Sequence, residues 1–439
     1  MRWLRRTLTR LRDSLFVVPV AMILVAGGLA GLSLLVDTRN IEYLAQNPLI
    51  LSATVSGGRA IATTVAGATI TVAAIVFSIT ALLTQEAATQ YSPRSVGGFI
   101  EDLFQQSVIG LVLGTFTFSL VILAGLNDVL DQTEEATPTL SVTLAIVFGV
   151  ISAIAIVAYI DHSMRRMQID NVVRRIAGDA LEAVRHEQRQ RQVDTGQAKT
   201  ETGPPEGEPS RVRSSKVGWV VGIDGSHLLD ALPPRTTANV EVRVGEAVSR
   251  GDHIATVWAD SGDLTLTPQA EREIEKAIQT DAQRSEETDA AFGIRQLTDI
   301  ALRAISPAVN DPTTAVDVIH HLKVPLREIL AAEAPLRVLE GPEGRTAFLS
   351  EAPSRSDYVH HAFSEIRLSA SSHPLVLRAL LEVLHDLKAD FGNNGSQGRL
   401  AAVEEEFRLT LDAALKSDLP EPDIRRIVYG YREEDLEGA

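Results

Sequence analysis

The chain of 439 residues contains no cysteine. This absence excludes disulfide bonds, thiolate metal sites and a cysteine nucleophile, and it is compatible with any compartment. A concentrated basic stripe is also missing, and the formal net charge is −16. That balance argues against a nucleic-acid partner, because nucleic-acid binding needs clustered positive charge.

Several catalytic and cofactor motifs are missing as well. The sequence has no P-loop, no dinucleotide-binding glycine motif, no H-E-x-x-H and no nucleophile elbow. We therefore expect no cofactor and no catalytic residue of these classes. The missing motifs make a membrane-tethered enzyme the weakest of three functional hypotheses for this chain.

Four long apolar runs are present before residue 163. At about 1.5 Å per residue, each is long enough to cross a hydrocarbon core of about 30 Å. The first run is too long for the apolar core of a signal peptide, so we interpret it as a retained span. The sequence predicts a mainly α protein with a four-span transmembrane helical domain over residues 1–163, its spans being 14–36, 61–83, 107–126 and 140–160.

The arginines predict the orientation of these spans. Five arginines lie among the first twelve residues, and Arg165, Arg166, Arg174 and Arg175 follow the fourth span. The loop between the third and fourth spans holds four acidic residues and no Lys or Arg. Because positive residues stay on the cytoplasmic side, we expect a bacterial inner-membrane protein with both termini in the cytoplasm.

The stretch 57–92 predicts a helix about 50 Å long, which exceeds the hydrocarbon thickness. We expect it to continue into the aqueous phase and to end near Pro93. Its opposite side is bulky and is expected to face lipid. One seam of small or polar residues follows the helix, with Glu86 near its cytoplasmic mouth: Thr64, Gly67, Thr71, Ser78 and Gln85.

The seam has two interpretations. Small residues let membrane helices pack closely, so the seam is a packing surface in the first one. In the second it lines a pore or a water-facing groove, and a ring of Glu86 in an oligomer would favour cations. We expect a homo-oligomer, because the seam requires a partner. The permeant ion or ligand is unknown.

The remaining chain is predicted to be outside the membrane, in the cytoplasm. Residues 164–215 form a basic juxtamembrane helix near anionic headgroups and then a flexible polar linker. Short β-branched segments predict a small β barrel over 216–262, similar to biotinyl and lipoyl carriers but without their hairpin lysine. Residues 263–439 predict a helical bundle.

A polar corner stands out in the helical part. Arg295, Asp299 and Arg303 are four residues apart on one helix face and predict an ion-pair ladder. Ser306-Pro307 ends that helix, and Asp311-Pro312 begins the next with Asp311 as its N-cap. This corner is either a capped helix junction or an anion or ligand site at a helix amino terminus. Its candidate residues are Arg295, Asp299, Arg303, Asn310, Asp311, Thr313 and Thr314.

Two Asp–His pairs follow with the same spacing. Asp317 precedes His321, and Asp357 precedes His361. A metal site would need both pairs to converge, with His373 as a further ligand. Such pairs are common on solvated helix faces, so we expect no metal.

Two stretches resemble a known family. FSITALLTQEAATQYSPR (77–94) and FGIRQLTDIALRAISPAVNDPTTA (292–315) are similar to the bacterial predicted-membrane-protein family DUF2254, with glycine expected at the position of Ala308. The resemblance covers most of the chain. It implies membrane location and the overall plan, but no reaction and no catalytic residues.

Our leading hypothesis is a channel-like or transport-associated oligomer with a cytoplasmic regulatory domain. The long hydroxyl seam favours it. The alternative is a non-conducting membrane scaffold or regulator, which the uncharged spans favour.

Overall fold

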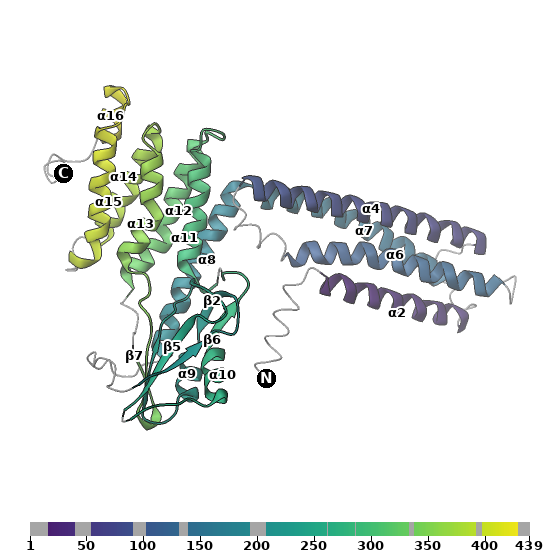
Figure 1. The fold of residues 1–439 in the computed structure, drawn as a ribbon. Coiled ribbons are helices and arrows are strands. Elements are labelled where there is room, and N and C mark those ends of the chain that lie inside the picture. Colours follow the sequence, from purple (N-terminus) through teal and green to yellow (C-terminus); the bar gives the residue numbers. More distant parts are fainter. Residues whose placement is uncertain are drawn as a thin grey trace. The chain divides into compact units, whose positions relative to one another are not determined.

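The computed structural model of the chain describes residues 16–39, 54–90, 102–130, 139–193, 208–260, 262–285, 287–332, 338–391 and 397–428 (Figure 1). The chain divides into two compact units. The first unit is Met1–Gln168, and the second unit is Ile169–Ala439.

The first unit consists of four helices that are long and apolar enough to cross a membrane. Their number confirms the prediction of four spans. The second of them, α4, is the longest, as its sequence predicts, and its described residues end before Pro93. The bounds are α2 (Val17–Arg39), α4 (Val55–Gln90), α6 (Leu103–Leu130) and α7 (Thr139–Arg166).

Helix α6 is the most buried of the four, because half of its apolar window lies inside the unit. Glycine lets α2 come close to it. A Cβ added at Gly110 would lie 2.6 Å from the sulfur of Met22, which is too near for any side chain. Further along α6, Phe118, Ile122 and Leu126 are fully buried. These side chains form an apolar core with Ala30, Ala62 and Ala145.

A buried carboxylate joins the first and last helices of the unit. Asp37, near the end of α2, is only 3% exposed. Its oxygens accept hydrogen bonds from the backbone N–H groups of Leu140 (3.0 Å) and Ser141 (2.9 Å) and from the Ser141 hydroxyl (2.6 Å). The first backbone N–H groups of a helix have no acceptor within it. Asp37 supplies such acceptors to the first turn of α7.

The second unit contains a helical bundle. Helix α8 belongs to it, since one face of α8 is buried against α11 and α12. Only the outer face of α8 is left for the headgroup contact that its basic residues predict. The helices are α8 (Ile169–Val193), α11 (Ala290–Ala304), α12 (Pro312–Ala331), α13 (Arg355–Ser369), α14 (Pro374–Phe391), α15 (Gln397–Leu415) and α16 (Glu421–Val428).

Close packing of α8 on α11 depends on one glycine. A Cβ added at Gly293 would lie 2.7 Å from the Cβ of Ala180. The seven-residue spacing of apolar side chains on α8 explains why this face is covered. Its buried residues include Val172, Val173, Ile176, Ala177, Ala180, Ala183 and Val184.

The prediction of a small β barrel is wrong, because the described strands form two open sheets. One sheet has the order β1-β5-β3-β8-β7, and the other has the order β4-β2-β6. The strands are β1 (Ser210–Arg213), β2 (Gly218–Ile223), β3 (Thr236–Val240), β4 (Ala247–Val248), β5 (His253–Ala259), β6 (Ile278–Asp281), β7 (Val338–Gly341) and β8 (Arg345–Phe348). Helices α9 (Gly225–Ala231) and α10 (Pro268–Ala277) pack with them.

Distant segments explain the open sheets. Strand β3 pairs antiparallel with β5 on one side and parallel with β8 on the other. Strands β7 and β8 follow α12 in the chain, and β1 lies in the stretch expected to be a linker. The three short β-branched segments could therefore not close on themselves as a barrel would.

An arginine anchors the smaller sheet to the bundle. Arg284 lies over the rings of Trp219 (5.5 Å) and Phe292 (5.0 Å) and donates from Nε to the buried Asp289 carboxylate (2.8 Å). Asp289 also caps α11 by accepting from the Phe292 N–H. Gly245 has a left-handed φ of 84°, and a Cβ there would meet the Asp289 oxygen at 2.5 Å.

Candidate functional site

The seam on α4 is exposed along its length in the single chain. Every predicted seam residue is exposed, namely Thr64, Gly67, Thr71, Ser78, Gln85 and Glu86. The face that α4 buries instead contains Ala62, Ala66, Ala73 and Val76. The expectation that the bulky side of α4 would face lipid is wrong. Val76 is 2% exposed and Val72 and Ile79 are partly buried, because this side packs with α6 and α7.

The seam hydroxyls find acceptors within their own helix. Thr64, Thr71 and Ser78 each donate to the carbonyl four residues earlier, at 2.7, 2.9 and 2.9 Å. Such back-bonding satisfies a hydroxyl in surroundings without water. The seam is therefore suited to contact with another apolar surface, and water is not required.

The exposed faces of the other outer helices are different. On α2 and α7 they are rich in large aliphatic side chains, which are compatible with lipid. The exposed face of α4 mixes a few such side chains with the seam. The large exposed residues of α2 and α7 include Leu24, Val25, Leu32, Ile154, Val157 and Met164.

A charged cluster lies where α6 begins and α7 ends. Asp102 precedes α6, and its side chain is 10% exposed. One of its oxygens accepts from the Phe104 N–H (2.9 Å), and the other lies 2.7 Å from His162 Nε2 and 3.0 Å from Arg166 Nη1. The spans had suggested almost no ionisable group, so sequence reasoning missed this cluster. The sequence signal that could have identified it is the acidic residue Asp102 directly before an apolar helix, the position of an N-cap.

Polar side chains of α4, α6 and α7 meet beside this cluster. The Tyr159 hydroxyl is fully buried and lies 2.6 Å from the Thr80 hydroxyl. Gln105 Nε2 donates to the same Thr80 oxygen at 3.5 Å. A cavity of about 30 Å³ is lined by these residues together with Asp102 and Arg166. That volume is enough for a water molecule, which would have several polar partners.

The predicted corner of the second unit is built around Arg295. Its guanidinium bridges two carboxylates, because Nε donates to Asp299 on α11 (2.7 Å) and Nη1 and Nη2 donate to Glu365 on α13. The Glu365 hydrogen bond raises the pKa of Arg295, and the same bond lowers the pKa of Glu365. The pairing of Arg295 with Asp299 follows the predicted ladder, whereas Glu365 was not expected. Arg303 is exposed.

The corner itself is a compact turn. Asp311 is the N-cap of α12, accepting from the Thr314 N–H (3.2 Å) and the Thr314 hydroxyl (2.6 Å). Asn310 takes the left-handed backbone, with a φ of 51°. Thr313 is exposed. These hydrogen bonds account for a capped helix junction, and the ligand interpretation stays a prediction.

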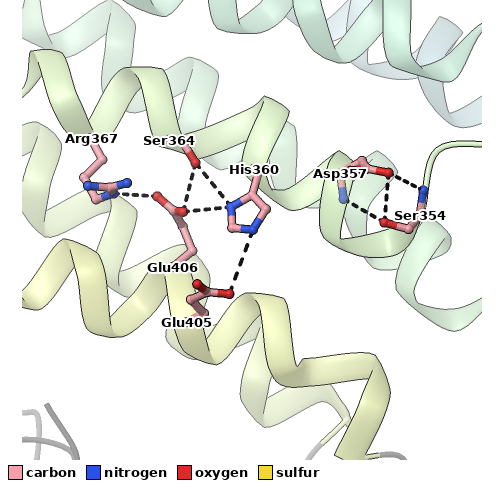
Figure 2. Close-up of polar contacts among 7 residues, drawn as sticks. All are labelled: Ser354, Asp357, His360, Ser364, Arg367, Glu405 and Glu406. Carbon is pink, nitrogen blue, oxygen red and sulfur yellow. Dashed lines mark hydrogen bonds and ion pairs between the residues drawn. The ribbon is translucent and has the colours of Figure 1, made fainter.

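In both Asp–His pairs, one member forms hydrogen bonds with a residue close to it in the sequence. His321 Nδ1 lies 2.8 Å from the carbonyl oxygen of Asp317. Asp357 forms a capping box with Ser354 at the start of α13 (Figure 2). Within the part of the chain that the structure describes, no three metal-ligating side chains gather as a metal site would require.

A third polar cluster, not anticipated from the sequence, joins α13 to α15 (Figure 2). Glu406 on α15 is fully buried. Arg367 Nε donates to it at 2.7 Å, and the Ser364 hydroxyl donates at 3.0 Å. Glu406 ends a run of three glutamates at 404–406 that itself gives no sign of burial, so only the helical period could have placed it inside.

Comparison with known proteins places the chain among membrane proteins of unknown activity. The family model described as predicted membrane protein (DUF2254) matches residues 12–386, which confirms the resemblance. Uncharacterized proteins of Mycobacterium bovis (Mb1321c) and Mycobacterium tuberculosis (Rv1290c) are 29% identical over 427 residues, covering 96% of this chain and 80% of theirs. No solved structure matches.

Proposed function

The chain belongs to the predicted-membrane-protein family DUF2254, and we propose that it is a channel-like or transport-associated protein of the bacterial inner membrane. It works as an assembly of copies that meet through α4. Both termini lie in the cytoplasm, where the second unit regulates the membrane helices. The permeant species is a small ion or ligand.

The exposed seam of α4 carries this proposal. Small residues suit close contact between helices, whereas the outer faces of α2 and α7 suit lipid. Most soluble oligomers are homo-oligomers, and a second copy is likewise the partner proposed for this face. A path through a single copy is blocked, because Phe118, Ile122 and Leu126 fill its interior. Conduction therefore requires a path between copies.

The absence of cysteine makes the contact directly testable. We expect Ser78→Cys in native membranes to form a disulfide between copies under mild oxidation. The matched control is Val157→Cys, since Val157 on α7 is 70% exposed and should face lipid. Equal cross-linking of both variants, or none at Ser78→Cys, would rule out α4 as the contact.

A measurement of ion flux distinguishes a conducting assembly from a non-conducting one. Protein in liposomes should pass a small ion, and Ser78→Leu should abolish this flux. A Thr64→Cys reporter in the same chain should still cross-link, which shows that the assembly is intact. Cross-linking without flux in the unaltered protein, over several salts and both membrane polarities, would exclude the channel.

The second candidate is a non-conducting scaffold or regulator. The observation that favours it is the back-bonding of the seam hydroxyls, because Thr64, Thr71 and Ser78 need no water. In that case the assembly forms through the same face of α4, and Ser78→Leu weakens cross-linking at Thr64→Cys without any flux to lose.

A further inference from the structure

The cluster between α13 and α15 contains a carboxylate that α13 alone neutralises. Glu406 is fully buried, and both of its closest donors, Arg367 Nε (2.7 Å) and the Ser364 hydroxyl (3.0 Å), belong to α13 (Figure 2). A buried carboxylate is stable only with such partners. The contact between the two helices therefore depends on charge.

His360 occupies the open side of this cluster. Its Nδ1 lies 3.3 Å from a Glu406 oxygen, and its Nε2 lies 4.0 Å from a Glu405 oxygen (Figure 2). The His360 side chain is 38% exposed and that of Glu405 is 52% exposed. Bulk protons thus reach the imidazole, while both ring nitrogens face carboxylates of α15.

The charges of the cluster are unbalanced when the imidazole is neutral. The cluster then holds two carboxylates and one guanidinium: Arg367 pairs with Glu406, and Glu405 faces only the uncharged His360 among these residues. A proton on His360 adds a second positive charge on α13 and brings the sum to zero. Imidazole is the side chain whose ordinary change of charge lies between about pH 5 and 8.

Other charged groups near α13 pair with residues outside this cluster. Asp357 is held by Ser354, whose backbone hydrogen bond lowers the pKa of Asp357, and Arg295 of α11 is held by Glu365 and Asp299. His361 lies next to His360, and its charge acts on Asp357 and Glu365. On α12, Lys323 and Arg327 face carboxylates of α14, namely Asp386 and Asp390.

One further imidazole faces α15. His385 of α14 packs with the ring of Phe407 at 6.4 Å, and Lys388 lies over the same ring at 5.3 Å. Phe407 follows Glu406 directly in the sequence. A test of His360 must therefore include His385 and His361 as controls.

We propose that His360 is a pH-dependent latch between α13 and α15. In acid the protonated imidazole holds both glutamates of α15. As the pH rises and the proton leaves, Glu406 keeps Arg367, the cluster is left with one excess negative charge on α15, and α15 loosens. The device stands on the second unit alone and does not depend on the proposed function of the membrane helices.

Amide hydrogen exchange of the full-length protein in nanodiscs tests the latch. After correction for intrinsic exchange, we expect protection of α15 to fall about fivefold between pH 5.5 and pH 8, which corresponds to one partly exposed ion pair. His360→Gln should remove this pH dependence and leave α15 at its high-pH level. Glu405→Gln should reduce the dependence, because one of the two carboxylates is gone.

His361→Gln and His385→Gln are the matched controls, because both place the same substitution beside the latch. We expect each to retain the pH dependence of the unaltered protein. A His360→Gln protein whose α15 still loosens with rising pH would overturn the proposal. So would loss of the effect in either control, because the responsible imidazole would then be a different one.

Discussion

Asp37 shows how a single side chain can fix the geometry of two helices. Its carboxylate is buried and takes three hydrogen bonds from the start of α7. Asp37→Ala leaves the Leu140 and Ser141 N–H groups without these acceptors, so we expect a loss of about 2 kcal/mol in the free energy of unfolding.

Thermal unfolding in detergent measures this loss. The neighbouring Thr38→Ala is the control, because the exposed Thr38 hydroxyl bonds only to Leu35 of its own helix. We expect Thr38→Ala to leave the midpoint nearly unchanged. Similar midpoints for the two variants would show that Asp37 does not stabilise α7.

Glu365 provides a pH-dependent contribution to the stability of the second unit. Its pKa is lowered by the hydrogen bond from Arg295. A carboxyl whose folded pKa lies below its ordinary value of about 4.3 stabilises the fold above that value, and the contribution disappears as the pH falls through the folded pKa. Glu365→Gln should therefore lose less stability than the unaltered protein between pH 6 and pH 3.

The difference should stay below about 1 kcal/mol, because the side chain of Glu365 is half exposed and solvent screens the pair. Unfolding midpoints at pH 6, 4.5 and 3 measure it. Glu404→Gln, on an exposed part of α15, serves as the control. A Glu365→Gln profile parallel to that of the unaltered protein would contradict the assignment to this ion pair.

Side chains of this kind were the least predictable part of the molecule. Asp102, Glu406 and Glu365 gain their partners from helices far away in the sequence, so spacing along one helix could not identify them. The local interactions were predictable. Asp311 caps α12, and Arg295 pairs with Asp299, because both partners lie within one turn.

At the scale of elements, the packing of α8 against α11 depends on Gly293. We expect Gly293→Ala to destabilise the second unit by about 1–3 kcal/mol, because the added Cβ would overlap Ala180. Gly178→Ala is the matched control. That position on α8 has open space, so alanine there should be neutral or slightly stabilising.

Chemical unfolding of the two variants measures the difference. Combining Gly293→Ala with Ala180→Gly moves the methyl group from one helix to the other and should restore most of the loss. A double variant as unstable as the sum of its single substitutions would show that the contact is not the cause.

The elements themselves followed from sequence patterns to different degrees. The four apolar helices were predicted from length and composition, since each run exceeds the hydrocarbon thickness. The two sheets were not, because β7 and β8 reach β3 only through the tertiary fold. Three strands read in isolation suggested a barrel, although β2 pairs with β6 after α10 and β3 pairs with β8 after α12.

For the whole molecule, the position of α8 defines which piece of chain can fold alone. A fragment covering residues 169–439 keeps the apolar residues of α8, such as Val173 and Ile176, buried against α11 and α12. A fragment beginning at residue 194 lacks that helix and exposes its partners' surfaces. We expect the first fragment to be monodisperse and the second to aggregate.

Size-exclusion chromatography and thermal melting of the two fragments measure this difference. The comparison is well matched, because the fragments differ only by α8. Equal behaviour of both would mean that the bundle does not need α8, and the second unit would then have to begin after it.

The parallel pairing of β3 with β8 also affects the order of events during synthesis. Thr237 pairs with Thr346, more than a hundred residues later. At the usual pace of translation, β3 waits roughly 5–20 s for this neighbour. Until then it exposes an unpaired strand edge, the kind of surface on which nascent chains join one another. Ribosomes that pause between these two strands should therefore produce the form of the protein most dependent on a chaperone.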